Sequence, residues 1–207
     1  MSTLDGEGVS RFLEASCGSP YRDVLLVALY TGLRRSEVLA LKWDNVDLDN
    51  SRLFVVAGLH FITGQGLVLL PTKNTRSRRP VTFTQEVVDV LRAIRGAQLV
   101  SQLDLGPVMQ DTGLVFTKSD GMPMDPAKVT KAFKAVTKKA GLSGVRLHDL
   151  RHTHASLMLL AGVHPKIVGK RLGHASINIT LDTYSHVLPG LQEDAAEKFS
   201  QVIRDAR

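Results

Sequence analysis

The sequence predicts a mainly helical α+β fold in which a small three-stranded antiparallel sheet packs on a helical body. Apolar residues recur at helical spacing over most of the 207 residues. Residues 52–83 differ, because short runs rich in Val, Leu and Phe alternate there with glycines and one basic turn. No internal repeat, low-complexity segment or strong domain boundary is visible in the sequence. We therefore expect a single domain over residues 1–207.

The composition indicates a globular protein that favours an anionic partner. Hydrophobic residues make up 43% of the chain, enough to form a real core. The formal charge is +6 and the sequence pI is about 9.6. Nucleic acid is the commonest partner of such a chain and an anionic membrane surface the second, while incidental basicity explains the charge equally well. With Cys17 as its one cysteine, the chain can form neither a disulfide framework nor a thiolate zinc site.

No segment predicts secretion or membrane insertion. The start, MSTLDGEGVS, is polar and lacks the apolar run of a signal peptide. The apolar segment 24–30 is far too short to cross a bilayer. We expect a cytoplasmic protein that does not enter a membrane.

Helical segments fill the first part of the chain. Residues 8–15 predict a short helix, and Pro20 fits the start of a second one that is apolar nearly all round. Gly32 ends this second helix, and helical spacing then resumes in LRRSEVLALKW. Arg34 lies at this junction, where it is either held firmly against the buried segment or exposed as an ordinary surface arginine.

The strands of the predicted sheet are residues 52–57, 67–70 and 79–83. The glycines between the first two strands predict a longer loop. The second and third strands are joined by PTKNTRSRR, a turn that contains cations and no acid. Such a turn suits a phosphate backbone, although a solvated turn is the commoner explanation. Its cations are Lys73, Arg76, Arg78 and Arg79.

Helices return after the sheet. Residues 84–95 predict a moderately amphipathic helix, and residues 96–113 a loop with some helix. Residues 126–140 predict a helix with one apolar and one basic face. Solvation alone explains lysines on that face, but the lack of interleaved acids favours DNA or RNA. These lysines are Lys128, Lys131, Lys134 and Lys138.

The last part of the chain predicts helices at residues 148–161, 165–172, 177–184 and 191–203. The final helix has an apolar stripe that either packs on its own domain or docks on a neighbouring protomer. The stripe consists of Leu191, Ala195, Phe199 and Ile203.

Chemistry-bearing residues gather between positions 146 and 184. His148 and Arg151 are three residues apart and share one helix face, while His174 follows a Leu-Gly turn and Tyr184 lies ten residues further on. This set suits a phosphate group, because it offers a fixed cation, two imidazoles and a hydroxyl that can attack.

Three interpretations of this set stay open on the residues alone. Metal binding by His148 and its neighbours is disfavoured, because His148 and His152 lack the glutamate of the zincin spacing. Metal-free phosphoryl transfer requires side-chain cations, for which Arg34, Arg151 and Lys73 are candidates. A structural role explains the remaining histidines best, namely His152, His154, His164 and His186.

The motifs TGLRRSE, the basic turn with Lys73, HDLRHTHAS, LGHASINIT and DTYSHV occur in this order. In sequence and spacing the chain resembles the catalytic domain of the tyrosine recombinases, the phage integrase family, over residues 8–190. Each motif is weak alone, but five in the right order are specific. The resemblance implies the tyrosine-recombinase catalytic fold and a site-specific recombinase or integrase that cleaves and rejoins DNA through a 3′-phosphotyrosyl intermediate.

The resemblance assigns the phosphate-binding roles as follows. Arg34 and Arg151 match the two family arginines that bind the non-bridging oxygens of the scissile phosphate, a task that suits bidentate guanidinium groups. His174 matches a residue that hydrogen-bonds the phosphate. Glu37 matches a family acid that orients the site.

The resemblance also assigns the groups that react. Tyr184 matches the nucleophile. Lys73 matches the lysine that protonates the departing 5′-hydroxyl, and His148 the residue that acts in proton transfer near the tyrosine. No metal ion or other cofactor is implied, because the covalent intermediate keeps the phosphodiester energy.

The resemblance further implies double-stranded DNA as the partner, a monomer that assembles into a homotetramer on DNA, and a nucleoid-associated protein. The N-terminal helical domain that clamps DNA in this family has no counterpart in the chain, which we expect to be the catalytic part of a longer protein. The alternatives are type IB topoisomerase-like relaxation of DNA and a catalytically silent DNA-binding relative.

Overall fold

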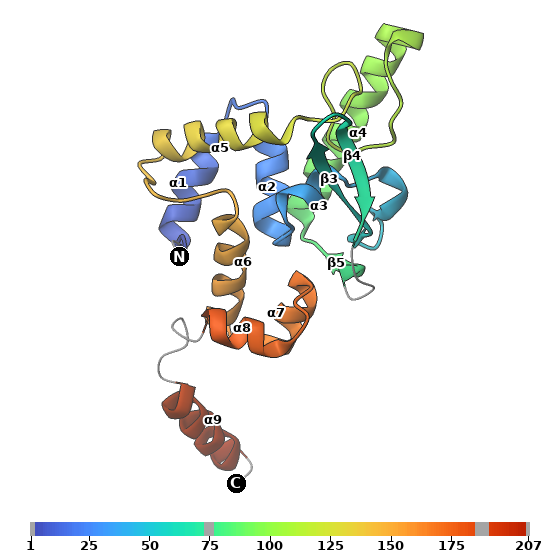
Figure 1. Cartoon of the computed structure of the whole chain (residues 1–207). Coiled ribbons are helices and arrows are strands. Elements are labelled where there is room, and N and C mark those ends of the chain that lie inside the picture. Colours follow the sequence, from blue (N-terminus) through green and yellow to red (C-terminus); the bar gives the residue numbers. More distant parts are fainter. Residues whose placement is uncertain (1–2, 73–76, 185–190, 206–207) are drawn as a thin grey trace.

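The computed structural model describes residues 3–72, 77–184 and 191–205. For residues 191–195 and 198 it describes the backbone only. A helical body holds the core, and the strands lie beside it (Figure 1). None of the described helices is long and apolar enough to cross a bilayer. The helices are α1 (Gly6–Ser16), α2 (Arg22–Thr31), α3 (Arg35–Leu39), α4 (Gln85–Leu105), α5 (Pro126–Lys139), α6 (Asp149–Leu160), α7 (Pro165–Leu172), α8 (Ile177–Tyr184) and α9 (Leu191–Asp205), with 3-10 turns at Trp43–Asn45 and Gly106–Val108.

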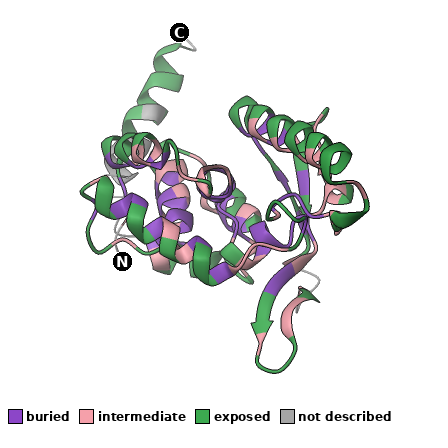
Figure 2. Ribbon diagram, turned by 90° about the horizontal axis from the view of Figure 1, so that it is seen from above, coloured by how far each residue is buried: buried purple, intermediate pink, exposed green. Residues whose placement is uncertain are grey.

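Helix α2 runs through the middle of the core, as its all-round apolar sequence predicts. Residues 24–29 are all buried, and α2 packs on α3, α4 and α6. The rings of Phe12 in α1 and Phe133 in α5 meet at 5.6 Å between centroids. Figure 2 shows this buried interior running through the helices, while the outer helix faces are exposed. The core therefore fixes the position at which α2 ends, and with it the start of α3.

The strands form two antiparallel units in the described part of the chain, and not the one sheet that we expected. Strands β1 (Val46–Asp47), β2 (Arg52–Val55) and β5 (Arg79–Thr82) form a three-stranded sheet in that order. Strands β3 (Ala57–Ile62) and β4 (Gly66–Pro71) form a separate hairpin. The expectation that residues 67–70 pair within the three-stranded sheet was wrong.

The glycines explain this error. Gly58 is one of the glycines from which the sequence predicts a loop, but it lies inside β3. A Cβ atom at this position would come within 2.8 Å of the His60 ring. It is a strand glycine at a crowded position. Gly64 and Gly66 have positive φ values and make the turn between the two strands.

Helix α4 continues ten residues beyond the predicted end at residue 95. Its buried residues are confined to the first two turns, so apolar periodicity does not mark the rest. A polar contact anchors the second half: Gln98 accepts a hydrogen bond from Trp43 Nε1 at 2.7 Å and donates to the carbonyls of Leu114 and Val115. The segment LRRSEVLALKW is also less helical than predicted, because α3 ends at Leu39.

Helices α6, α7 and α8 lie together below α2 and α3 (Figure 1) and begin and end close to their predicted positions. They enclose a second, smaller apolar cluster that includes Leu159, Val168 and Leu172. Tyr184, at the end of α8, is fully buried in this cluster. Packing of three short helices thus brings the last residue of α8 against α6.

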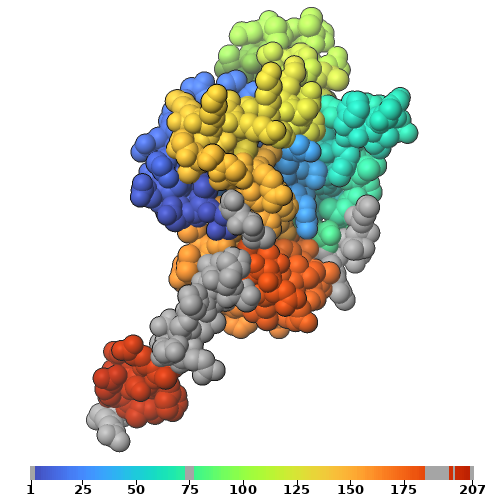
Figure 3. Space-filling view, turned by 60° about the vertical axis from the view of Figure 1, so that its left-hand side comes forward, coloured from blue at the N-terminus to red at the C-terminus, as the bar shows by residue number. Residues whose placement is uncertain are grey.

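Helix α9 projects from the body formed by residues 3–184 (Figure 3). Of its predicted apolar stripe, the described side chains of Phe199 and Ile203 are 68% and 45% exposed. This part of the stripe is largely exposed in the described part of the chain.

Candidate active site

The buried carboxylate of Glu37 joins two arginines at the start of α3. Its oxygens accept a hydrogen bond from Arg34 Nη1 at 2.8 Å and from the Arg34 backbone N–H at 2.9 Å. They also accept bonds from Nη1 and Nη2 of Arg79, at 3.2 and 2.9 Å. Glu37 is the third residue of α3, a position from which an acid can satisfy the backbone N–H that precedes the helix. Arg79 comes from β5, so the carboxylate connects the helical body to the sheet.

This arrangement keeps Glu37 ionised and Arg34 in place. Burial raises the pKa of Glu37, but the hydrogen bonds and charge of Arg79, and then those of Arg34, outweigh burial and hold the pKa below its ordinary value. The side chain of Arg34 is 40% exposed, so its guanidinium is tied at one edge and open to a ligand at the other. Of the two possibilities that the sequence left open for Arg34, the structure shows the held side chain, because Glu37 binds both its guanidinium and its backbone N–H.

The Arg151 guanidinium lies between the C-terminal ends of two helices. Nη1 donates to the carbonyl of Gly32 at 2.9 Å, and Nη2 donates to the carbonyl of Leu172. Carbonyls at helix C-termini lack intrahelical partners and carry partial negative charge, so they hold a cation well. Burial, followed by the charge of Arg34, lowers the pKa of Arg151 to about 9, which leaves it protonated at neutral pH. Arg151 is buried, and no carboxylate among the described residues forms an ion pair with it.

His174 follows the left-handed Gly173 that ends α7. Its Nδ1 lies 2.8 Å from the hydroxyl oxygen of Thr180 in α8, and its backbone N–H donates to the carbonyl of Gly169. These two contacts fix the ring. Burial, followed by the charges of Arg151 and Arg34, lowers the pKa of His174 to about 4, so the ring is neutral and close to both arginines.

Tyr184 meets His152, a histidine of α6. The Tyr184 hydroxyl lies 2.8 Å from Nδ1 of His152, and their ring centroids are 5.8 Å apart. Burial raises the pKa of Tyr184 to about 12, while the charge of Arg151 acts in the opposite direction. The hydroxyl is therefore protonated at neutral pH, and the charge that acts on it belongs to Arg151, one of the predicted phosphate ligands.

His148 lies one turn before His152 on α6, and their rings meet edge to face at 4.8 Å. Burial, followed by the charges of Arg151 and Arg34, lowers the pKa of His148. Unlike Tyr184, His148 is exposed.

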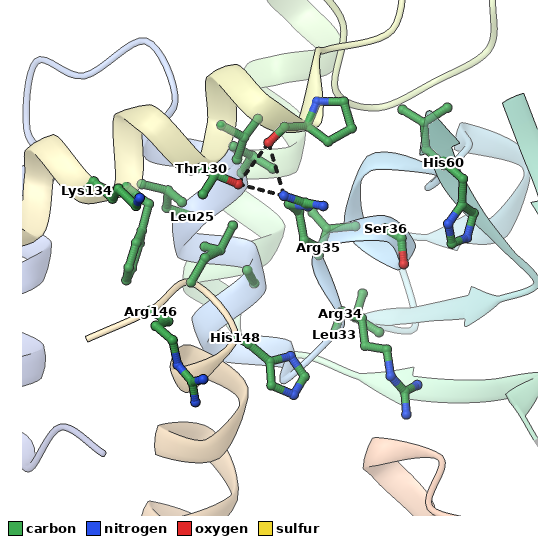
Figure 4. Close-up of a pocket in the computed structure, with 18 of the residues that line it drawn as sticks. Leu25, Leu33, Arg34, Arg35, Ser36, His60, Thr130, Lys134, Arg146 and His148 are labelled. Atoms are coloured by element: carbon green, nitrogen blue, oxygen red, sulfur yellow. Dashed lines mark hydrogen bonds between the residues drawn. The ribbon is translucent and has the colours of Figure 1, made fainter. Parts of the chain in front are cut away.

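A cavity of about 780 Å³ opens beside this group, and His148 lies at its edge (Figure 4). Apolar side chains such as Leu25, Leu33 and Phe133 line its floor. Arg35 is held across it by hydrogen bonds to the Thr130 hydroxyl at 2.6 Å and the Pro126 carbonyl, as Figure 4 shows. The cationic and titratable residues of its lining are Arg34, Arg35, His60, Lys134, Arg146 and His148.

The structure thus brings together Arg34, Glu37, His148, Arg151, His174 and Tyr184, which are up to 150 positions apart in the sequence. Lys73 and Arg76 lie outside the described residues. Arg78 is exposed. Arg79 was expected on the surface of the turn, but its side chain is only 5% exposed. It forms an ion pair with Glu37 and donates a hydrogen bond to the carbonyl of Arg171.

The basic face of α5 is present, but only part of it faces the cavity. All four predicted lysines are exposed. Lys134 is the one among them that lines the cavity. Lys128, Lys131 and Lys138 stand elsewhere on the helix surface.

Of the four histidines for which a structural role was expected, His154 and His164 have one in the structure. His154 accepts a hydrogen bond from Arg171 Nε at 2.9 Å, and His164 Nδ1 accepts one from the backbone N–H of Lys166 at the start of α7. His186 lies outside the described residues. His152 differs, since it contacts Tyr184; its position four residues after His148 is the sequence signal that places it on the same helix face.

Metal binding by the histidines of α6 has no support in the described part of the chain. No group of three or more His, Cys, Asp or Glu side chains lies there in an arrangement that could hold a metal ion.

Comparison with known proteins identifies the family of the chain. The model of the phage integrase family matches residues 2–190. A tyrosine recombinase XerC-like protein of Caldanaerobacter subterraneus subsp. tengcongensis is 30% identical over 213 aligned residues, covering 98% of this chain and 54% of that protein. The ICEBs1 integrase of Bacillus subtilis is 30% identical over 183 residues, covering 88% of this chain and 49% of that protein. The chain therefore spans about half the length of these relatives.

Solved structures share the fold. The Tn1549 transposon integrase, in complex with transposon right end DNA, superposes with a TM-score of 0.81 at 23% identity, over 96% of this chain and 66% of that one. The XerA recombinase superposes with a TM-score of 0.72 at 24% identity, over 96% of this chain and 65% of that one. The mainly helical α+β fold with a small antiparallel sheet is confirmed, and the chain belongs to the phage integrase family.

Proposed function

We propose that this protein is a site-specific DNA recombinase that cleaves and rejoins DNA strands through a 3′-phosphotyrosyl intermediate, and that residues 1–207 form its catalytic domain. One observation carries the proposal. The hydroxyl of Tyr184 lies in the same buried region as the Arg151 guanidinium, which has no ion-pair partner among the described carboxylates. A phosphodiester bound there stands next to a nucleophile.

The two arginines bind the non-bridging oxygens of that phosphodiester. Carbonyl groups hold Arg151 from behind, and Glu37 holds one edge of Arg34. Neither guanidinium has to reorganise when charge develops on the phosphate, which is the condition for strong electrostatic stabilisation. His174, neutral and fixed by Thr180, supplies a hydrogen bond to the same phosphate.

In the attack the Tyr184 hydroxyl gives its proton to a histidine of the site, and its oxygen forms a bond to phosphorus. The bond from phosphorus to the 5′-oxygen breaks, and the 5′-oxygen takes a proton from Lys73. The reverse attack by a 5′-hydroxyl rejoins the strand and releases the tyrosine. The number of phosphodiester-type bonds stays constant, so the exchange requires neither ATP nor a metal ion.

The cavity beside His148 and the exposed cations around it form the surface that we assign to double-stranded DNA. Arg35 and Lys134 line the cavity, and Arg78 and the other α5 lysines extend the basic surface. Phosphate contacts of this type position a duplex without reading its sequence. Relatives are named recombinases and integrases, and solved neighbours are described as bound to DNA, which supports a DNA partner and a nucleoid-associated protein. We further propose a monomer that assembles as a tetramer on DNA.

Covalent capture tests the proposal. The protein, in the longest reading frame that contains this chain, is incubated with nicked fragments of DNA from its source organism and then denatured. Fragments that stay attached to the protein are sequenced. We expect a 3′-linked adduct at one site, its loss in Tyr184→Phe, and no effect of EDTA.

Other outcomes of this experiment contradict the proposal. Adducts scattered without sequence preference, together with relaxation of supercoiled plasmid, would indicate a topoisomerase-like enzyme. Salt-sensitive DNA binding without any adduct would indicate a silent relative. An undiminished adduct in Tyr184→Phe would exclude Tyr184 as the nucleophile.

A further inference from the structure

The Tyr184 hydroxyl contacts His152. Within the described part of the chain it forms no hydrogen bond with His148. His152 Nδ1 and Tyr184 Oη are 2.8 Å apart, a good hydrogen-bond distance. His152 is half-buried on α6, and its ring is wedged between the rings of His148 and Tyr184. Contact with a reacting atom is the first requirement for a general base.

We propose that His152 accepts the phenolic proton of Tyr184 during strand cleavage and returns it during rejoining. This assignment rests on the proposed recombinase function and names a further catalytic residue for it. In cleavage the Tyr184 O–H bond breaks, its proton passes to the lone pair of Nδ1, and its electron pair forms the bond to phosphorus. The bond from phosphorus to the 5′-oxygen breaks at the same time. For this step Nε2 of His152 carries the ring proton and Nδ1 is free.

The charges around His152 keep that lone pair free. Burial, followed by the charges of His148, Arg151 and Arg146, lowers the pKa of His152 to about 4, against the opposing charge of Asp149. The ring is therefore neutral at neutral pH. The phenol does not need to ionise beforehand, because its O–H proton becomes strongly acidic as the oxygen bonds to phosphorus. Proton transfer to the imidazole therefore becomes favourable during the attack.

His148 has a different environment. It is exposed and lines the cavity, and it touches His152 through its ring and not through a hydrogen bond. Its place suits contact with the DNA or the phosphate. The proposed base, His152, is therefore a different residue from His148, the histidine of the His-x-x-Arg motif.

Two substitutions separate proton acceptance from positioning. His152→Ala removes both the hydrogen bond and the base. His152→Asn keeps a polar acceptor close to the position of Nδ1 but takes up no proton. The substrate is a nicked duplex that carries the site found by covalent capture, and single-turnover adduct formation is measured. His164→Asn is the matched control, because His164 is exposed, caps α7 and can be replaced by another capping residue.

We expect both His152 variants to form the adduct about 10²–10⁴-fold more slowly at neutral pH, the usual contribution of a general base. The rate of His152→Asn should rise by up to tenfold per pH unit above neutrality, as the phenol of Tyr184 ionises on its own. The wild-type rate should be nearly constant over the same range. Free imidazole should accelerate His152→Ala and leave His164→Asn unchanged.

A near-wild-type rate of His152→Asn would overturn the proposal, because a hydrogen bond alone would then suffice. A deficit that stays the same at every pH and is not relieved by imidazole would also overturn it and leave His152 a structural residue. Should His152→Ala fail to fold, the pH profile of His152→Asn decides alone. Absence of an adduct in the wild type would instead mean that the recombinase function itself is wrong.

Discussion

At the scale of single residues, Glu37 holds Arg34 in the proposed phosphate site. It is a buried acid that binds Arg34 from the site and Arg79 from β5. A buried charge without its partner is strongly destabilising, whereas an exposed pair contributes little. Arg79 was expected to meet DNA, but its contribution is to keep this acid charged and in place.

Glu37→Gln should lower the free energy of unfolding by about 3 kcal/mol at pH 7, because the Arg79 guanidinium loses its buried counter-charge. Urea unfolding followed by circular dichroism measures this. Glu7→Gln, which removes an exposed acid paired with Arg11, should change the value by less than about 0.5 kcal/mol. An equal effect of both substitutions would contradict the role of the buried pair.

The lowered pKa of Glu37 predicts that the effect of Glu37→Gln on stability depends on pH. The folded-state pKa of Glu37 is lowered, so its contribution is fully present above the ordinary value of 4.5 and is lost as pH falls through the folded-state pKa. The difference in unfolding free energy between wild type and Glu37→Gln should therefore shrink below pH 4.5. A difference that stays constant down to pH 3 would contradict the assigned pKa direction.

Arg151→Lys tests the guanidinium itself. Lysine keeps the charge but cannot donate to the carbonyls of Gly32 and Leu172 and still present a flat pair of donors to a phosphate. Adduct formation should fall about 10²–10³-fold, the usual cost of removing a donor to a developing charge. A rate within threefold of wild type would show that charge alone is sufficient.

At the scale of elements, the α2–α3 junction positions both arginines. Gly32 ends α2 with φ of +67°, its carbonyl binds Arg151, and Arg34 follows two residues later. A Cβ atom on Gly32 would come within 2.6 Å of the His154 ring and 2.9 Å of Leu172. The turn is therefore packed directly against α6, which carries Arg151, and α7, which leads to His174.

Gly32→Ala should destabilise the fold by about 2–4 kcal/mol, which combines roughly 1–2 kcal/mol for a left-handed backbone with the cost of overpacking. Gly18→Ala is the matched control, because Gly18 has φ of +79° and open space around its Cα. It should cost only the backbone part, about 1–2 kcal/mol. Thermal and urea unfolding of both variants give the comparison, and equal costs would exclude the packing effect.

At the scale of the whole molecule, the cavity beside His148 is a single surface built by α2, α3, β3, α5 and the start of α6. Its cations stand on different elements, so only the folded chain offers them to one ligand. Arg35 is pre-ordered by Thr130 and Pro126, which reduces the entropy lost on binding.

The double variant Arg35→Gln and Lys134→Gln should weaken binding to a duplex of any sequence. The slope of log affinity against log salt should fall by about two, one for each phosphate contact. Arg92→Gln, an exposed cation of α4 outside the cavity, should leave the slope unchanged. Equal slopes for both variants, measured by fluorescence anisotropy, would place the DNA elsewhere.

Much of this was predictable from the sequence. The helices around Gly32, Pro126 and Gly173 begin and end where capping residues and apolar periodicity place them. The order and spacing of the motifs named the family and selected Arg34, Arg151, His174 and Tyr184. Strand pairing was not predictable, because a glycine at a crowded strand position and a glycine in a loop look alike in one sequence.

The sequence by itself determined the family, the residue types of the proposed phosphate site and most of the helices that carry them. Tertiary structure alone decided which side chains touch. It turned Arg79 inward to Glu37 and brought His152 to the Tyr184 hydroxyl. The physical reason is that periodicity reports which helix face is buried, whereas hydrogen-bond partners depend on how helices distant in the sequence pack against one another.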